Sequence, residues 1–289
     1  MSSRPAPAPV EEEALTPPLP VFEPQGPDEP VTWVRANGIE VLVPAEDKVV
    51  TPYMERKHDW DGSLLSAILD CLSPRSVFLD VGAFVGYISA AAAKRMPQGT
   101  VIAVEPSTPS LELAALNLGG FRNTIVLQGA ISNSPELTWE VVTDGTNRGN
   151  TRVEVGAAAS TTQTMTVQTC TLGSAIRYYG CDVVKIDVQG MEKDVLESLD
   201  LDDDTLPNDL TLFCEITPEM WTSETDILAT IDRFRAAGFD AYFLTETNAY
   251  SYVSPARLSR RVEVSSRWAD HFELMLTRGR YAATIRGRS

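Results

Sequence analysis

Short apolar runs alternate with stretches of helical periodicity over most of the chain. The apolar runs cover residues 76–81, 100–105, 124–130, 182–187, 210–216, 239–244 and 272–276. Several lack the apolar–polar alternation of a half-exposed strand, which is typical of strands buried on both faces. Helices are expected between them, at residues 87–95, 109–118, 172–179 and 226–237. This order predicts an α/β fold with a mainly parallel sheet and helices on both of its faces.

A β-hairpin is expected before this pattern begins. Residues 31–35 and 39–43 alternate apolar and polar positions around Asn37-Gly38, which is a strong signal for a two-residue turn. A looser polar and aromatic stretch follows at residues 52–61. It leads into a helix with apolar positions from residue 64 to residue 72, for which Ser63 is the candidate cap. The looser stretch either folds over a ligand or forms a solvated connection.

The segment 132–171 interrupts the alternation of strands and helices. It contains apolar runs at residues 137–142 and 165–170, separated by a Gly-, Asn- and Thr-rich run at residues 144–151. We expect an inserted antiparallel excursion with a mobile loop rather than a helix. Loops at the ligand end of a sheet often determine substrate choice. The insert therefore either selects the substrate or only extends the sheet edge.

The two ends of the chain differ in composition from its middle. Residues 1–30 are rich in proline and include an acidic run, which is typical of disorder, although a polyproline II ligand for a partner is an alternative. The Arg-rich stretch 257–288 is expected to be solvated surface or a fraying terminus. The predicted organisation is a leader (1–30), a hairpin and helix (31–75), a main domain (76–280) that contains the insert, and a tail (281–289).

Composition narrows the class of protein. The chain has 289 residues and a net charge of −16, which argues against nonspecific nucleic-acid binding because that depends on Lys and Arg. It lacks both an apolar run of the ~20 residues that a membrane span needs and an apolar signal core. Scattered cysteines at positions 71, 170, 181 and 214 indicate reduced thiols, and we expect a cytoplasmic protein. His58 and His271 form no metal-ligand pattern.

A glycine turn follows the first buried strand. Asp80 ends the apolar run, Gly82 and Gly86 frame a turn, and an Ala-rich helix begins directly after it. Glycine is needed where the backbone takes a positive φ or approaches a ligand closely. The first amides of a helix are unpaired and favour polar or anionic groups. The turn predicts a nucleotide-like ligand, and the alternative is a plain strand–turn–helix with no ligand.

The next strand indicates which nucleotide the turn would bind. Glu105 ends this strand roughly 20 residues after the glycine turn, where an acid accepts hydrogen bonds from ribose hydroxyls. A dinucleotide site needs Gly-x-Gly-x-x-Gly, but Phe84 occupies the position of the middle glycine, and the turn has no P-loop lysine. An adenosine without a pyrophosphate fits better, so we expect S-adenosylmethionine, with Asp80 pairing with its amino group. Residues 128–131 would then lie beside the adenine.

Four predicted strands end in an acidic residue, namely Asp80, Glu105, Asp187 and Glu215. One acid at the end of a strand is usually a helix cap. Four along one edge indicate a binding site, because open α/β sheets bind ligands along the edge formed by the carboxyl ends of their strands.

Several motifs of the chain together resemble those of a known family. The matching motifs are Asp80-Val81-Gly82-Ala83 with Gly86-Tyr87, Glu105-Pro106, Asn117, and Lys185-Ile186-Asp187-Val188-Gln189-Gly190-Met191-Glu192. They resemble the FkbM family of S-adenosylmethionine-dependent methyltransferases over roughly residues 50–250. The resemblance implies a class I methyltransferase Rossmann-like fold, with a seven-stranded, mainly parallel sheet whose last strand is antiparallel. It also implies methyl transfer to a hydroxyl of a sugar, glycolipid or polyketide-type metabolite.

The resemblance also implies which residues bind the cofactor. They are Asp80, Gly82, Ala83, Phe84, Gly86, Tyr87, Glu105, Pro106, Gly129, Ala130 and Asp187. The chain departs from the family pattern at three positions, with Phe84 in place of Asn, Gln189 in place of Glu, and Gly173 in place of Asp. The first departure lies in the cofactor turn, and the second removes a carboxylate from the expected reaction edge.

Methyl transfer to an alcohol favours a carboxylate that removes the hydroxyl proton. Asp187 is the first candidate for this base, with Glu215 and Glu192 as alternatives, and Asp187 equally suits a cofactor-orienting or capping role. Phe84, Tyr87 and Trp60 suit either cation–π contact with a sulfonium or core packing. Two other functions stay open: a scaffold that binds the cofactor without turnover, and a nicotinamide-dependent oxidoreductase. The expected partner is a small-molecule or glycan-like acceptor.

Overall fold

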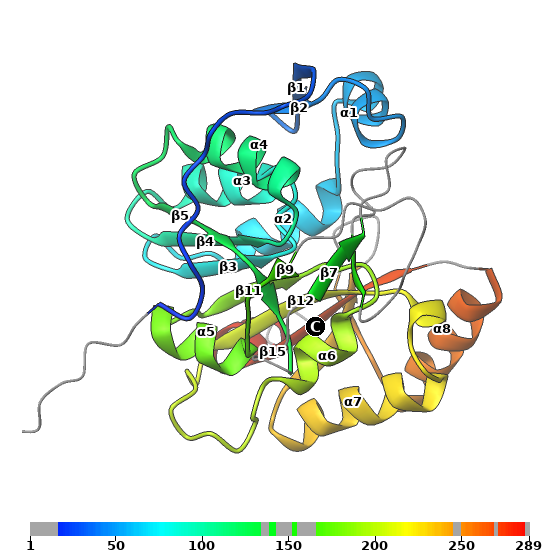
Figure 1. Cartoon of the computed structure of the whole chain (residues 1–289). Coiled ribbons are helices and arrows are strands. Elements are labelled where there is room, and N and C mark those ends of the chain that lie inside the picture. Colours follow the sequence, from blue (N-terminus) through cyan, green and yellow to red (C-terminus); the bar gives the residue numbers. More distant parts are fainter. Residues whose placement is uncertain are drawn as a thin grey trace, which may run out of the picture.

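The computed structural model describes residues 17–133, 139–142, 152–154, 166–244, 250–268 and 271–286 of the chain. Within these residues, a sheet of eight strands runs through the centre of the molecule, in the order β14-β13-β15-β12-β11-β3-β4-β5 (Figure 1). From one edge to the other the strands are β14 (Tyr250–Tyr252), β13 (Asp240–Leu244), β15 (Phe272–Arg278), β12 (Leu210–Ile216), β11 (Val183–Ile186), β3 (Val77–Val81), β4 (Thr100–Glu105) and β5 (Thr124–Gln128).

Most of the sheet is parallel. Strands β5, β4, β3, β11 and β12 pair in parallel, whereas β15 pairs antiparallel with both β12 and β13. The class I methyltransferase sheet that the resemblance implies is confirmed. It has one strand more than expected, because β14 pairs antiparallel with the edge of β13. The apolar pattern did not indicate β14, since this strand is only Tyr250–Tyr252.

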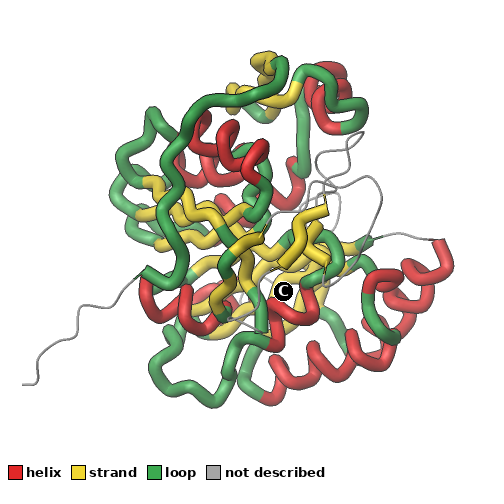
Figure 2. The backbone as a smooth tube through the Cα atoms, in the orientation of Figure 1, coloured by secondary structure: helices red, strands yellow, loops and turns green. Residues whose placement is uncertain are grey.

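Helices cover both faces of the sheet (Figures 1 and 2). One face carries α2 (Gly62–Cys71), α3 (Tyr87–Arg95) and α4 (Thr108–Leu118), and the other carries α5 (Leu172–Tyr179), α6 (Glu192–Glu197), α7 (Glu224–Ala236) and α8 (Pro255–Trp268). Buried strand residues alternate between the two layers, so Phe78 packs with the α2–α3 side and Leu79 with the opposite side. None of the helices in the described residues is long and apolar enough to cross a lipid bilayer.

The predicted hairpin is present and packs against the glycine turn. Strands β1 (Val31–Ala36) and β2 (Ile39–Pro44) pair antiparallel, with Ala36 opposite Ile39 across the turn. The Asn117 side chain on α4 accepts a hydrogen bond from Leu42 N (2.7 Å) and donates to Leu42 O (2.9 Å) and Val85 O (2.8 Å). One amide therefore fixes β2 to the turn that follows β3.

The stretch 52–61, predicted as loose, is largely helical. Helix α1 (Val50–Lys57) begins before Pro52, because the Asp47 carboxylate accepts hydrogen bonds from the first amides of the helix. Pro52 lies in the first turn, where its missing N–H is not needed. The prediction that Ser63 caps the next helix is wrong, since α2 begins at Gly62 and Asp61 occupies the N-cap position with a φ of 47°.

Order begins earlier than the predicted end of the leader. Leu19 is 2% exposed in the core, and Val21 forms an antiparallel bridge with Leu127. Phe22 N donates to Val126 O (2.8 Å), so this segment pairs with the free edge of β5. The Glu112 carboxylate accepts hydrogen bonds from the backbone amides of residues 25 and 26. The prediction of disorder is therefore wrong for residues 17–30, and residues 1–16 lie outside the described residues.

The Arg-rich stretch 257–288 is also more ordered than predicted. Helix α8 buries Leu258 and Val262, and α9 (Arg280–Arg286) buries Ala282 and Ile285. The prediction of a solvated or fraying tail is wrong for most of this stretch, because each helix has an apolar face that packs on the core. The prediction missed these apolar faces because it was based on the high arginine content of the stretch.

The insert forms the predicted antiparallel excursion. Strands β7 (Trp139–Val142), β8 (Arg152–Glu154) and β9 (Thr166–Val167) make a separate antiparallel sheet in the order β8-β7-β9. Strand β10 (Thr169–Cys170) then pairs in parallel with β6 (Ala130–Ile131), which Gly129 separates from β5. The loop predicted to be mobile, at residues 144–151, lies outside the described residues.

Candidate active site

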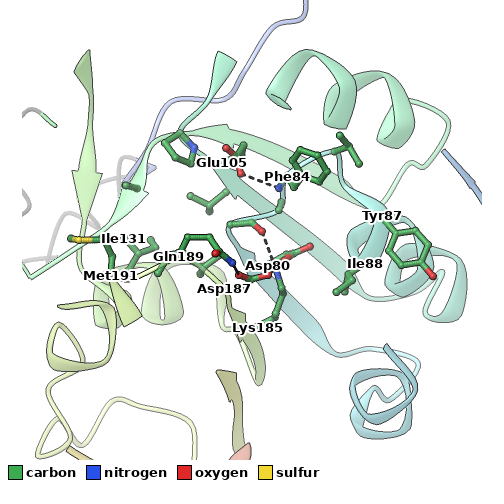
Figure 3. A pocket seen from close by; sticks show the side chains of 18 of the residues that line it. Asp80, Phe84, Tyr87, Ile88, Glu105, Ile131, Lys185, Asp187, Gln189 and Met191 are labelled. Carbon is green, nitrogen blue, oxygen red and sulfur yellow. Dashed lines mark hydrogen bonds and ion pairs between the residues drawn. The ribbon is translucent and has the colours of Figure 1, made fainter. Parts of the chain in front are cut away.

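A pocket lies at the carboxyl ends of the parallel strands (Figure 3). It contains about 1030 Å³ of space, counted out to open solvent. Its walls come from the turn after β3, the start of α3, the ends of β4 and β11, residues 129–132, and the N-terminal elements. The residues that line it include Trp60, Asp61, Asp80, Gly82, Phe84, Tyr87, Glu105, Ile131, Lys185, Asp187, Gln189 and Met191.

The pocket is apolar at both ends and acidic between them (Figure 3). Ile131 and Met191 lie at one end, and Tyr87 and Ile88 lie at the other. The carboxylates of the site lie between these apolar ends. A ligand that spans the pocket therefore contacts apolar groups at its tips and acidic groups along its middle.

The turn after β3 requires glycine because the backbone that follows β11 approaches it closely. Gly82 has a φ of 77°, and a Cβ atom there would lie 1.8 Å from the Asp187 carbonyl oxygen. Its backbone amide and that of Ala83 both donate to Val104 O at 3.0 Å. Phe84 also has a left-handed backbone, with a φ of 50°. The turn after β3 is thus fixed against both neighbouring strands, and a side chain at Gly82 would separate it from β11.

Glu105 connects the end of β4 to this turn. Its Oε2 accepts a hydrogen bond from Phe84 N (2.9 Å), and its Oε1 accepts one from Ser107 N (3.0 Å). The residue is only 5% exposed, and burial raises its pKa to about 7, although these amides oppose the shift. Glu105 therefore orders the turn and also presents a carboxylate to the pocket.

A buried lysine on β11 links Asp80 on the neighbouring strand β3 to Asp187 at the end of β11 itself. Lys185 Nζ donates to Gly82 O (2.8 Å) and lies 3.4 Å from Asp80 Oδ1 and 3.2 Å from Asp187 Oδ2. Burial alone would lower the pKa of Lys185, but Asp187 and Asp80 raise it above its ordinary value. The second Asp80 oxygen accepts a hydrogen bond from Ser89 Oγ at 2.7 Å. The partners of Asp80 are thus Lys185 and Ser89, and its side chain forms the floor of the pocket.

Gln189 bridges the carboxylate of Asp187, which lines the pocket, and that of Glu215, which does not. Its Nε2 lies 2.8 Å from Asp187 Oδ1 and 3.3 Å from Glu215 Oε1, and its backbone φ is 51°. Burial, with the charges of Asp187 and Glu273, raises the pKa of Glu215 to about 10. Glu273 lies directly opposite Glu215 on the neighbouring antiparallel strand. Glu215 therefore keeps its proton to a higher pH than an ordinary glutamate does.

Glu192 has a structural position. It is fully buried, and its carboxylate accepts hydrogen bonds from Gly190 N (3.0 Å) and Val188 N (3.3 Å). Burial raises its pKa to about 7, an effect that the Gly190 amide opposes. These contacts close the turn between β11 and α6 rather than facing a ligand.

Most of the predicted site residues come together in the pocket. Its walls include Asp80, Gly82, Ala83, Phe84, Tyr87, Glu105, Pro106, Gly129, Ala130 and Asp187. Gly86, Glu192 and Glu215 are not among the pocket-lining residues. The sequence reasoning missed Lys185 and Asp61. Lys185 had a signal, since it is a single charge inside a strand that is otherwise apolar.

The charged side chains of the pocket fit a cationic adenosine rather than a dinucleotide. Among the described lining residues, Lys185 is the one basic side chain, and its contacts to Asp80, Asp187 and Gly82 O leave it committed. A pyrophosphate would find no free cation there, whereas the acidic middle of the pocket complements a positive sulfur. Glu105 provides the acceptor that ribose hydroxyls require.

Comparisons with known proteins agree with this chemistry. A family model described as Methyltransferase FkbM domain matches residues 80–241. No curated protein sequence matches the chain.

Several solved structures are similar to the chain at low identity. A precorrin-6y C5,15-methyltransferase from Geobacter metallireducens GS-15 is 14% identical, over 74% of this chain and 88% of that one, with a TM-score of 0.40. An rRNA methylase from Streptococcus thermophilus is 12% identical, over 75% and 95%, with a TM-score of 0.42. TYW2 from M. jannaschii, solved in complex with AdoMet, is 10% identical, over 88% of each chain, with a TM-score of 0.42.

Proposed function

Because the chain belongs to the FkbM methyltransferase family and uses S-adenosylmethionine, we propose that it methylates a hydroxyl oxygen of a small-molecule or glycan-like acceptor. The observation that carries this proposal is the Asp187 carboxylate, which lies in the pocket between Lys185 and Gln189. A hydroxyl is a weak nucleophile, and a nearby ionised carboxylate is the group that strengthens it.

We assign the cofactor an extended position along the pocket. The apolar end at Ile131 and Met191 suits the adenine, with Gly129 and Ala130 beside it, and the Glu105 carboxylate suits the ribose hydroxyls. The methionine part would then reach the end formed by Tyr87 and the glycine turn. When bound, S-adenosylmethionine supplies a methyl group on a positively charged sulfur.

Asp187 is the best-placed base. Its side chain is 24% exposed, so an acceptor can reach it, and Lys185 Nζ lies 3.2 Å from its Oδ2. Gln189 donates to Oδ1 and Lys185 contacts Oδ2, so the carboxylate is held in one orientation. Asp187 would accept the proton that the acceptor hydroxyl loses. Removing such a base typically slows a reaction by ~10²–10⁴-fold.

The two alternative bases are less suited to this role. Glu215 lies behind Gln189, and its raised pKa makes it less readily ionised than an ordinary glutamate. Glu192 is buried and holds the backbone amides of its own turn. We therefore assign Glu215 and Glu192 to the support of the Asp187 loop.

The proposal is tested with Asp187→Asn, which keeps the size of the side chain and removes its basicity. Calorimetry with S-adenosylhomocysteine should show binding within about threefold of wild type, since the base does not hold the cofactor. Release of S-adenosylhomocysteine should be followed with a panel of sugar, glycolipid and polyketide hydroxyl acceptors. With any acceptor that wild type methylates, the variant should be slower by ~10²–10⁴-fold.

Glu197→Gln is the matched control, because Glu197 is a partly exposed carboxylate on α6 that forms an ion pair with Lys193 at 2.7 Å. It should retain full turnover. Wild-type turnover in Asp187→Asn would exclude Asp187 as the base, and a wild-type protein that fails to bind S-adenosylhomocysteine would exclude the pocket assignment. A product with the new methyl group on nitrogen would contradict O-methylation.

A further inference from the structure

The turn of the N-terminal hairpin carries a side chain that the turn itself does not need. Asn37 and Gly38 have φ values of 48° and 76°, as a two-residue hairpin turn requires. Gly or Asp would satisfy the same backbone geometry. The Asn37 amide group is therefore free to serve another purpose, and its contacts indicate which one.

The Asn37 side chain reaches two separate elements. Its Nδ2 donates to Asp59 Oδ1 (2.7 Å) and to the Tyr87 hydroxyl oxygen (2.8 Å), and Trp60 O lies 3.5 Å away. The two short contacts use both amide hydrogens. The backbone amide of Asn37 adds a hydrogen bond to His58 O at 2.9 Å. The hairpin turn thus joins the connection between α1 and α2 to the first residue of α3.

These two elements form neighbouring parts of the pocket wall. Trp60 and Asp61 line the pocket from the connection, and Tyr87 lines it from α3. The connection has left-handed backbone at both His58 (φ 53°), which caps the end of α1, and Asp61 (φ 47°), which precedes α2, so residues 59 and 60 between them belong to neither helix. Its position therefore depends on contacts from outside, and Asn37 supplies three of its polar contacts.

We propose that Asn37 is a positioning residue that holds the Trp60–Asp61 wall against Tyr87 and so shapes the methionine end of the cofactor pocket. Asn37 is not a lining residue and touches no reacting atom. The inference rests on the proposed cofactor position, because Tyr87 marks the end assigned to the methionine part. It predicts that a change in a hairpin turn alters cofactor affinity without touching the pocket lining.

The first test is Asn37→Gly, which preserves the turn and removes the amide. Calorimetry with S-adenosylhomocysteine should show affinity about three- to tenfold weaker than wild type, as expected for the loss of one or two partly exposed hydrogen bonds. Hydrogen exchange should become faster at residues 58–61 in the free protein. Exchange across β1 and β2 should stay unchanged, because the hairpin itself is intact.

A swap of partners separates positioning from general damage. Asn37→Asp keeps the turn but places a carboxylate opposite Asp59, so affinity should fall at least as far as in Asn37→Gly. The double variant Asn37→Asp with Asp59→Asn restores a donor and an acceptor in reversed order, and should return affinity to within about twofold of wild type. Equal weakness of the single and double variants would contradict the proposal.

Glu40→Ala provides the matched control. Glu40 lies on the same hairpin and makes an exposed ion pair with Arg35 at 3.6 Å, away from the pocket. It should leave affinity unchanged. If wild type binds S-adenosylhomocysteine and Asn37→Gly binds it equally tightly, the role of Asn37 is overturned while the cofactor pocket stands. If wild type itself does not bind, the cofactor position fails instead.

Discussion

At the scale of single residues, the site depends on charges that are buried beside one another. Lys185, Asp80 and Asp187 form one cluster, in which the two carboxylates raise the pKa of Lys185, whereas burial raises the pKa of Asp80 although Lys185 opposes that shift. Glu105 has backbone amides as partners instead, and its pKa rises to about 7. This difference makes Glu105 a residue whose protonation depends on folding.

Glu105 should make stability depend on pH. Its folded pKa of about 7 lies above its ordinary value of 4.5, so between these pH values the folded protein binds a proton that the unfolded chain has lost. Its contribution to stability is therefore full below about pH 4.5 and is lost as the pH rises to about 7, by roughly 3 kcal/mol at most. Urea unfolding from pH 5 to pH 8 should show a smaller loss of stability in Glu105→Gln than in wild type.

Other buried acids with raised pKa values, such as Glu192 and Glu273, are present in both wild type and Glu105→Gln. Their contributions to the pH dependence of stability therefore cancel when the two are compared. The difference in slope therefore reports Glu105 alone. Parallel curves for wild type and Glu105→Gln would show that Glu105 is ionised throughout this pH range, as its two amide donors favour.

Patterns in the sequence predicted which residues belong to the site, but not which contacts these residues make. The glycine turn and the acids at the strand ends are local features, so they could be read directly from the chain. The pairing of Lys185 with Asp80 depends on the register of two parallel strands that lie 105 residues apart in the sequence. No local pattern determines that register, which is why the sequence left Asp80 free for a ligand while the structure gives it Lys185.

At the scale of elements, the segment that includes residues 19–22 acts as an additional edge of the main sheet. Its backbone pairs with β5, and Leu19 enters the core beneath Gly129. Sequence reasoning failed here because proline content dominates the composition, whereas one buried leucine and a few backbone hydrogen bonds decide the fold. The same holds for α8 and α9, whose apolar faces are short and interrupted by arginine.

Leu19→Ala should destabilise the protein by about 2–4 kcal/mol, because it leaves a cavity where a buried leucine was. Val21→Ala is the matched control. Val21 lies two residues away on the same segment but is 59% exposed, so its truncation should cost less than about 0.5 kcal/mol. Urea unfolding at one pH measures both. Equal effects would mean that the segment does not dock as described.

Each element that the sequence predicted has its turn residues or its apolar pattern within its own residues. The hairpin, the strands of the parallel sheet and α5 follow from turn residues and apolar runs in their own sequence. Helix α1 was missed because its first amides bond to Asp47, a residue outside the helix. Strand β14 was missed because its pairing with β13 supplies what its three residues lack.

At the scale of the whole molecule, charge separates classes of acceptor. The net charge of −16 repels phosphate backbones, and the pocket adds carboxylates rather than cations. We expect no binding of labelled tRNA or duplex DNA in fluorescence anisotropy at ~50 mM salt, over the protein concentrations of ~10⁻⁶–10⁻⁴ M at which nonspecific binders associate. Salt-sensitive binding in this range would contradict a small-molecule or glycan-like acceptor.

The single ammonium of Lys185 has a dynamic consequence. It contacts the carbonyl of Gly82 in the turn after β3 and the carboxylate of Asp187 in the loop after β11. We expect this ammonium to transmit a displacement of one loop to the other. With the proposed cofactor position and Asp187 as the proposed base, the gap between the methyl donor and the proton acceptor would then vary less than the position of either loop.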